Sequence, residues 1–190
     1  CAGASGRTRR RRQRVAVLHI KLGPRHFYRY HTPKWAYLPV SGAGAANAGG
    51  RFNRPGVEAL YLSAEPDTAL AEYRQGSSLP RPATLAAYEL HLNDIVDLSA
   101  GYDPSLWASS WADWNCDWRW TARVEHKVPP SWLLGDEAIR SGAAGLLFPS
   151  THQAAGTNLV VFIANLTTAD RLAVHDPDGM LPKDQRSWEP

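Results

Sequence analysis

The sequence predicts an α+β domain in which a mixed β-sheet forms the core and helices flank it. The predicted strands outnumber the predicted helices, and the two do not alternate as they do in a doubly wound sheet. The most apolar run, "LVVFIA" at 159–164, has the length of one buried strand and is too short to cross a membrane. With 190 residues, of which 44% are hydrophobic, the chain is long enough to bury a core.

The first predicted elements are two strands separated by a long loop. Residues 25–33, "RHFYRYHTP", are expected to be extended, and Pro33 is expected to end the strand. Residues 38–51 are rich in glycine and alanine, which predicts a loop. The apolar run "ALYLS" at 59–63 predicts the next strand.

A helix is predicted over residues 66–76, directly after this strand. Pro66 suits the first helical turn, where its missing N–H group has no partner to lose. Asp67 suits the positive end of the helix dipole, and Gly76 is a residue type that commonly ends helices. The strand and the helix are therefore expected to be joined by a short turn.

Two further strands, 84–92 and 95–99, are expected next, separated by the dipeptide Asn-Asp. Residues 105–120 then carry tryptophans at intervals of four, three and four, which places them on one face of a predicted helix. These tryptophans either pack the helix on the core, which we favour, or form an aromatic surface for a partner or a base. They are Trp107, Trp111, Trp114 and Trp118.

The last predicted elements are one helix and two strands. Residues 131–142 are expected to be helical, with Ser131 as a possible cap and Gly142 as the end. Strands are predicted at 145–150 and 158–165, joined by the polar loop "THQAAGT".

The positive charge of the chain is concentrated in residues 1–14. This segment holds six arginines and no acid, and without it the formal net charge changes from +3 to −3. We expect a basic disordered tail at 1–14, one domain at 15–175 and a C-terminal extension at 176–190. Nucleic-acid binding by the tail is the alternative, but the acidic balance of the remaining chain leads us to expect no direct nucleic-acid binding.

The two cysteines, Cys1 and Cys116, do not suggest a disulfide framework, and we find no candidate membrane span or signal peptide. We therefore expect a cytoplasmic protein. Phosphate-loop, zinc-protease and paired-cysteine motifs are missing, and "GAGAAN" at 42–47 lacks the third glycine of a dinucleotide fingerprint. The histidines are scattered, so we expect no metal site.

Polar and aromatic residues at the ends of the predicted strands are the candidates for a functional site. Each one alone has an ordinary structural explanation, but together they fit a ligand cleft. Glu72 lies at the border of the apolar face of its helix, and the glycines before Arg51 allow the backbone to approach a ligand. The candidates are Arg29, Tyr30, Arg51, Asn53, Tyr61, Glu72, Ser150, Thr157 and Asn158.

Three segments resemble the RES domain, a family named for an arginine, a glutamate and a serine. They are "FYRYH", "GGRFNRPGVEALYLSAEPDTALAEY" and "GAAGLLFPSTHQAAGTNLVVF", and they lie between residues 27 and 165. The three residues of the name correspond to Arg29, Glu72 and Ser150. Further pocket positions of the motif correspond to Tyr30, Arg51 and Tyr61.

The resemblance implies an NAD+-consuming toxin of a bacterial type II toxin–antitoxin system, with a fold like that of ADP-ribosyltransferase toxins. NAD+ would be the substrate, and ADP-ribose would pass to a protein, to phosphate or to water. The implied partner is a cognate antitoxin with a DNA-binding region that blocks the NAD+ pocket. The expected catalytic residues are Arg29, Glu72 and Ser150. The expected NAD+-binding residues are Arg29, Tyr30, Arg51, Asn53, Tyr61, Ser150 and Asn158.

The residue types agree with this chemistry. Loss of nicotinamide builds positive charge on the ribose, which the carboxylate of Glu72 would stabilise. Arg29 and Arg51 would bind the pyrophosphate, the two tyrosines of the motif would stack on nicotinamide, and Ser150 would hydrogen-bond the ribose or the leaving amide. A non-catalytic module that binds a nucleotide or docks a protein is the alternative.

Overall fold

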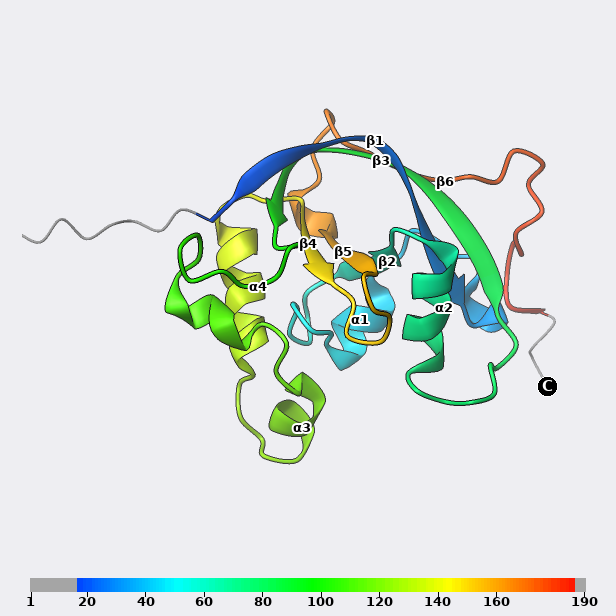
Figure 1. Cartoon of the computed structure of the whole chain (residues 1–190). Helices are drawn as coiled ribbons and strands as arrows, with labels where there is room; N and C mark the ends of the chain where they lie inside the picture. The colour runs from blue at the N-terminus through cyan, green and yellow to red at the C-terminus, as the bar shows by residue number, and fades with distance from the viewer. Residues whose placement is uncertain (1–16, 187–190) are drawn as a thin grey trace, which may run out of the picture.

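Residues 17–186, which the computed structural model describes, contain a six-stranded mixed sheet (Figure 1). The strand order is β1-β2-β5-β4-β3-β6, and β1 also pairs with β3, so five of the strands close into a ring. The pairs are antiparallel except for the parallel pair β3–β4. The strands are β1 (His19–His31), β2 (Ala59–Ser63), β3 (Thr84–Asp97), β4 (Gly145–Pro149), β5 (Thr157–Phe162) and β6 (Arg171–Val174).

The ring is weakest between β1 and β2, which pair only at Tyr28 and Ser63. Strand β1 pairs with β3 along most of its length, whereas β2 pairs with β5. The two strands therefore separate beyond this pair, and helix α2 (Pro66–Arg74) packs against both of them. The candidate functional site lies at this opening.

The long strands β1 and β3 arch over the rest of the molecule (Figure 1). β1 begins earlier than the predicted residue 25, because its ladder with β3 extends to the pair His19–Val96. β3 is continuous, so the predicted break at Asn93 and Asp94 is wrong. Asn93 instead stays in the strand, and its backbone N–H and side-chain amide both donate to the carboxylate of Asp170. Strand β6 was not predicted from the sequence.

The helices surround the sheet on several sides. The segment 38–51, which was predicted to be a loop throughout, contains a short helix. Helix α2 starts at Pro66 as predicted and ends at Arg74, two residues before Gly76, because Gln75 adopts a left-handed conformation with φ 47°. The other helices are α1 (Ala43–Ala48), α3 (Trp118–Arg123) and α4 (Pro130–Arg140), with 3-10 turns at Pro33–Trp35, Ser109–Asp113 and Ile163–Asn165.

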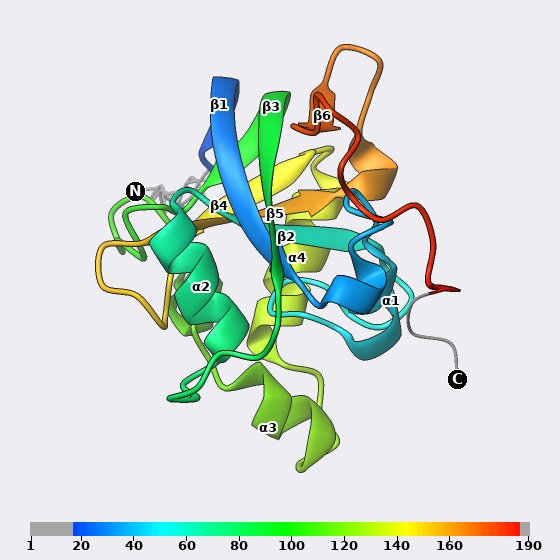
Figure 2. The same ribbon diagram turned by 90° about the vertical axis from the view of Figure 1, so that its right-hand side faces the viewer.

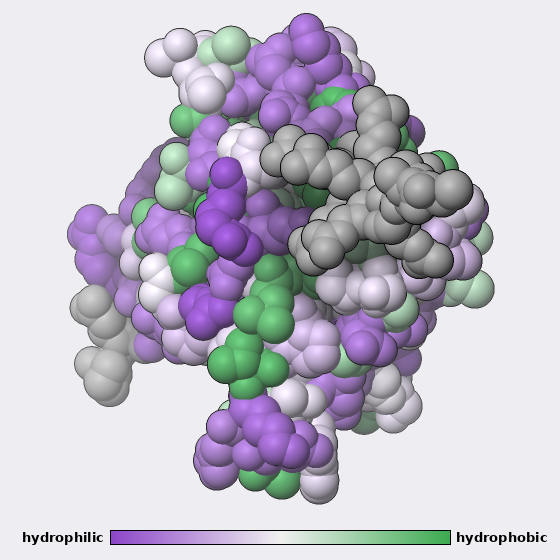
Figure 3. All heavy atoms as spheres, turned by 90° about the vertical axis from the view of Figure 1, so that its left-hand side faces the viewer, coloured by the Kyte–Doolittle hydropathy of each residue, from purple (hydrophilic) through white to green (hydrophobic). Residues whose placement is uncertain are grey.

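The tryptophan-rich segment is not the single helix that the sequence predicted. It forms a 3-10 turn and then a separate helix, α3, because the side chain of Asp117 accepts a hydrogen bond from the Trp120 N–H and so starts a new helix. The four tryptophans are nevertheless buried, as expected for side chains that pack on the core. Helix α3 itself projects from the body of the molecule, and its outer tip is polar (Figure 3).

Helix α4 differs slightly from the prediction at its first turn. It begins at Pro130, and Ser131 lies buried inside the helix rather than at its cap. Gly142 follows the helix with φ 91°, a conformation that favours glycine. Strand β5 ends at Phe162, earlier than the predicted residue 165, because a 3-10 turn follows it.

The hydrophobic core has two parts, one on each side of the central strands β2, β5 and β4. Along β5, Val160 contributes to the part that includes α4 and the tryptophans, whereas Leu159 and Val161 contribute to the part under β1 and β3. Figure 2 shows the same layers, with β1 and β3 in front of the central strands and α4 behind them. The central strands are therefore buried on both faces and form a rigid base for the residues at their ends.

The predicted basic tail at residues 1–14 lies outside the described residues. Between residues 17 and 186, no helix combines the length and the apolar character that a membrane crossing requires.

Helix α4 packs directly on the backbone of the loop that precedes β2. A Cβ atom added to Gly135 would lie 1.8 Å from the carbonyl oxygen of Phe52. Gly135→Ala should therefore lower the free energy of unfolding by about 1–3 kcal/mol, as measured by urea denaturation. Gly23→Ala is the matched control, because nothing lies within 4 Å of its added Cβ. Equal stability of the two variants would contradict this close contact.

Candidate functional site

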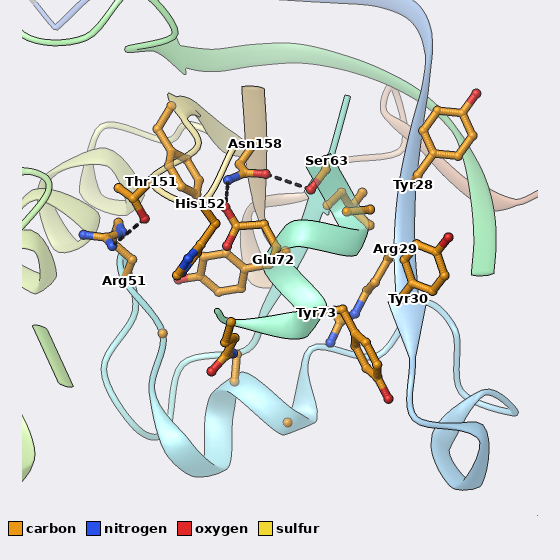
Figure 4. A pocket seen from close by; sticks show the side chains of 18 of the residues that line it. Tyr28, Arg29, Tyr30, Arg51, Ser63, Glu72, Tyr73, Thr151, His152 and Asn158 are labelled. Atoms are coloured by element: carbon orange, nitrogen blue, oxygen red, sulfur yellow. Dashed lines mark hydrogen bonds between the residues drawn. The ribbon is translucent and has the colours of Figure 1, made fainter. Parts of the chain in front are cut away.

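A pocket of about 390 Å³ lies where β1 and β2 separate (Figure 4). Its volume falls within the range of small-molecule sites. Residues from the strands β1, β2, β4 and β5, from the helices α1, α2 and α3, and from neighbouring loops form its wall. Those from the strands and α2 include Tyr28, Arg29, Tyr30, Tyr61, Leu62, Ser63, Glu72, Tyr73 and Asn158.

Glu72 of α2 lies in the middle of this pocket, with its carboxylate held from one side (Figure 4). Its Oε1 atom accepts hydrogen bonds from Ser150 Oγ and from Asn158 Nδ2, each at 2.7 Å. Among the described residues, Oε2 has no hydrogen-bond partner. The carboxylate therefore has a fixed orientation and one oxygen that remains available to a ligand.

The two donors to Glu72 are themselves fixed. Asn158 Oδ1 accepts a hydrogen bond from Ser63 Oγ at 2.7 Å, so its amide nitrogen must face Glu72. Ser150 Oγ accepts hydrogen bonds from the backbone N–H groups of His152 and Gln153 at 3.1 and 3.0 Å. Its own proton is then directed to the carboxylate. Ser150 does not line the pocket, and it reaches the site only through Glu72.

Tyr61 and Asn53 form a second hydrogen-bonded unit beside the pocket. The Tyr61 hydroxyl donates to Asn53 Oδ1 at 2.8 Å and accepts from the Phe52 N–H at 2.9 Å. Burial, opposed in part by the Phe52 hydrogen bond, raises the pKa of Tyr61 above its ordinary value. The phenol is therefore neutral and its hydroxyl is occupied, so that the ring is the part of Tyr61 that a ligand can contact.

Asn53 is fully enclosed and lies behind the pocket wall. Its amide nitrogen donates to the carbonyl groups of Ala45 and Val57, each at 2.9 Å. Gly50 packs against the same unit, because an added Cβ would lie 2.5 Å from both Asn53 Oδ1 and the Tyr61 hydroxyl. Asn53 thus supports the loop around the pocket instead of facing the cavity.

Arg29 of β1 brings a positive charge into the pocket without an acidic partner. No carboxylate among residues 17–186 lies within ion-pair distance of it, and its Nη1 atom is buried with no hydrogen-bond partner there. Desolvation lowers the pKa of Arg29, although an arginine remains charged at neutral pH. Because an unpaired buried charge is unfavourable, this guanidinium suits an anion that comes from outside the chain.

Arg51 lies in the pocket wall and also ties neighbouring loops together. Its Nη1 donates to the carbonyl of Cys116 at 3.0 Å and to that of Trp114 at 3.4 Å, and its Nη2 donates to Thr151 Oγ1 at 3.4 Å. Burial is the main reason that the pKa of Arg51 is lowered. Several of its donor groups are therefore already engaged within the protein.

Aromatic rings form another part of the wall. Tyr30 lies next to Tyr73 of α2, with their ring centroids 6.0 Å apart, and Tyr28 lies further along β1 (Figure 4). Sequence reasoning did not select Tyr28 or Tyr73, although both lie inside the quoted motifs next to selected residues. Thr157, a candidate at the start of β5, is not among the lining residues.

Three other lining residues were also missed: Trp118, Arg119 and His152. The only sequence signal for the first two was the tryptophan spacing, which suggested an aromatic surface for a partner or a base only as the less favoured alternative and did not place it in this pocket. With Arg119 included, the wall carries three guanidinium groups and one carboxylate. This charge balance suits an anionic ligand.

Behind Arg29, His31 and Tyr88 form a buried pair. His31 Nε2 lies 2.6 Å from the Tyr88 hydroxyl, which in turn donates to the Pro39 carbonyl at 2.7 Å. Burial and, secondarily, the charge of Arg29 lower the pKa of His31 to about 4. His31 is therefore neutral at pH 7 and adds no second charge beside Arg29.

The chain was compared with known proteins. The sequence profile of the RES domain matches residues 26–184. No curated protein matches the sequence. Among solved structures, a chain of the M. tuberculosis MbcT–MbcA toxin–antitoxin complex has a similar fold, with a TM-score of 0.56 and 20% sequence identity. That match covers 83% of this chain and 84% of the other.

The buried histidine predicts a pH dependence of stability. An unfolded histidine binds its proton with a pKa near 6.5, whereas folded His31 does so only near about 4, so acid favours the unfolded state between these values. The contribution of His31 is thus complete above about pH 6.5 and falls by roughly 3 kcal/mol by about pH 4. Urea denaturation from pH 4 to 7 should show a smaller loss for His31→Gln than for the unmodified protein. Parallel stability curves would show that His31 does not titrate in this way.

Proposed function

The chain belongs to the RES domain family, and we propose that it is an enzyme that consumes NAD+ by breaking the bond between nicotinamide and ribose. The observation that carries this proposal is the carboxylate of Glu72, fixed by Ser150 and Asn158 in a pocket whose other charged side chains are mainly arginines. An anionic dinucleotide with a reactive sugar needs both features.

The reaction calls for a carboxylate beside the sugar. When the bond breaks, its electron pair leaves with nicotinamide, and the ribose acquires positive, oxocarbenium-like charge. The free Oε2 of Glu72 would stabilise that charge or bind a ribose hydroxyl. Because Ser150 and Asn158 already hold Oε1, the carboxylate would not need to reorient as the charge develops.

The phosphates would lie against the guanidinium groups. Arg29 is the stronger candidate for direct contact, because its buried Nη1 has no partner in the described part of the chain. The rings of Tyr30, Tyr61 and Tyr73 would pack against nicotinamide or ribose. Ser150 and Asn53, which the sequence had suggested as ligand contacts, would act by positioning Glu72 and Tyr61.

ADP-ribose would pass to water, to phosphate or to a protein side chain. Attack by water yields free ADP-ribose and a proton, whereas attack by phosphate yields ADP-ribose phosphate. Attack by a side chain yields a modified protein. Mass spectrometry of the products, with and without phosphate and with added lysate protein, would assign the acceptor.

We further propose that the protein is a toxin controlled by an antitoxin. The similar fold found among solved structures comes from a toxin–antitoxin complex, and the family match favours the same role. An antitoxin with a DNA-binding region would inhibit this chain by covering the pocket between β1 and β2. Such control is needed when the substrate is an essential cofactor of the host cell.

Glu72→Gln tests the catalytic proposal. The amide keeps an oxygen that can accept from Ser150 and Asn158 but loses the negative charge, so nicotinamide release from NAD+ should fall by about 10²–10³-fold while NAD+ still binds. Nicotinamide is measured by chromatography. The matched control is Glu58→Gln, which changes an exposed glutamate outside this pocket. NAD+ binding without turnover by the unmodified protein would favour the non-catalytic alternative instead.

Arg29→Met should separate stability from binding. Removing a half-buried charge whose Nη1 atom is buried without a partner should raise the free energy of unfolding by about 1–3 kcal/mol, while the loss of a charge-assisted contact should weaken NAD+ binding by about tenfold or more. Thermal unfolding and calorimetry measure the two effects. Arg25→Met, at an exposed position of the same strand, should change neither. A destabilised Arg29→Met protein would mean that Arg29 is already paired when the site holds no ligand.

A further inference from the structure

Arg119 of α3 lines the pocket but has no assigned role. Its guanidinium carbon lies 4.6 Å from the centroid of the Trp118 ring, a distance at which an arginine stacks favourably on an indole. Among residues 17–186, it forms no ion pair and no side-chain hydrogen bond. Its hydrogen-bond donors are therefore free to meet a ligand.

The indole of Trp118, on which Arg119 stacks, is itself packed against a residue that contacts the pocket wall. Trp118 is buried and lies against Trp132, with ring centroids 6.4 Å apart. Trp132 Nε1 in turn donates to the carbonyl of Gly50, a lining residue, at 2.8 Å. Trp118 and Trp132 thus hold the Arg119 side chain in place beside Gly50 of the pocket wall. This limits the conformational entropy that Arg119 would lose on binding a ligand.

Arg119 complements Arg51 rather than duplicating it. Arg51 already donates to the carbonyls of Trp114 and Cys116 and to Thr151, whereas Arg119 has none of these ties. The charge of Arg119 also helps, after the larger effect of burial, to lower the pKa of Arg51, which places the two guanidinium groups near each other. Glu72 acts on Arg51 in the opposite direction, but its carboxylate is already bound by Ser150 and Asn158. Two neighbouring cations that line the same pocket favour an anion that binds both.

We infer that Arg119 binds the pyrophosphate of the substrate directly and makes the site selective for a dinucleotide over a nucleoside. This inference rests on the proposed consumption of NAD+. On this side of the pocket, Arg119 supplies the free donors, and Arg51 supplies charge and holds the loops. Arg119 is then a specificity residue that lies outside the three sequence segments on which the family resemblance rests.

The test is calorimetric binding of ADP-ribose, which carries the pyrophosphate but no nicotinamide and is therefore not consumed. Arg119→Gln should weaken its binding by about tenfold or more, because one charge-assisted contact is lost. Arg119→Lys should fall in between, since lysine keeps the charge but neither stacks nor binds in a bidentate manner. Arg123→Gln is the matched control, because Arg123 also lies over Trp118, at 5.7 Å, but does not line the pocket.

The outcomes separate this inference from the proposed function. Binding within about twofold of the unmodified protein in Arg119→Gln would overturn the role of Arg119 and leave NAD+ consumption intact. An equal loss in Arg123→Gln would also overturn it, by showing a general charge effect. If the unmodified protein binds neither ADP-ribose nor NAD+, the proposed function fails and the inference fails with it. Thermal unfolding of each variant checks that the fold is retained.

Discussion

The pocket exists because two neighbouring strands stay together for only one residue pair. β1 pairs with β3 along most of its length, and β2 pairs with β5, so in the described part of the chain Tyr28–Ser63 is the only residue pair between β1 and β2. Beyond it, the residues that would otherwise face each other across a sheet line a cavity. Helix α2 then closes one side of this cavity and brings Glu72 into it.

The charges of the site follow from this architecture. One oxygen of the Glu72 carboxylate accepts from two donors, Asn158 of β5 and Ser150 of the loop before it, and these donors keep the carboxylate in one orientation. Arg29 comes from the opposing strand and has no counter-charge in the described part of the chain. Such a cation is unfavourable for the isolated fold and is offset by the large buried core, a balance that is common where a protein is arranged for its ligand.

The sequence predicts the mixed sheet with flanking helices, and it predicts the strand and helix that carry Glu72, for reasons that are local. Alternating apolar residues give the strands, and the turn between 59–63 and 66–76 places Glu72 beside a strand end. Local sequence patterns do not predict features of the fold that depend on residues far away in the chain. The tryptophan spacing at 105–120 correctly indicated buried side chains but not a helix, because Asp117 begins a new one. The break expected within β3 is absent because β1 and Asp170 hold the strand on both sides.

The sequence also could not predict whether a given polar side chain faces the pocket or lies behind its wall. Ser150 and Asn53 belong to motif segments, yet each uses its hydrogen bonds on another site residue. Arg119 could not be selected, because its place in the pocket wall depends on the fold and not on a pattern along the chain.

The guanidinium of Arg51 connects two loops that border the pocket. It donates hydrogen bonds to the carbonyl of Cys116, in the loop that leads into α3, and to the hydroxyl of Thr151, the residue next to Ser150. One side chain thus connects the loop before the projecting helix α3 with the residue next to the serine that orients the carboxylate. A displacement of α3 relative to the loop after β4 would therefore stretch or break these hydrogen bonds of Arg51, although the two segments are far apart in the chain.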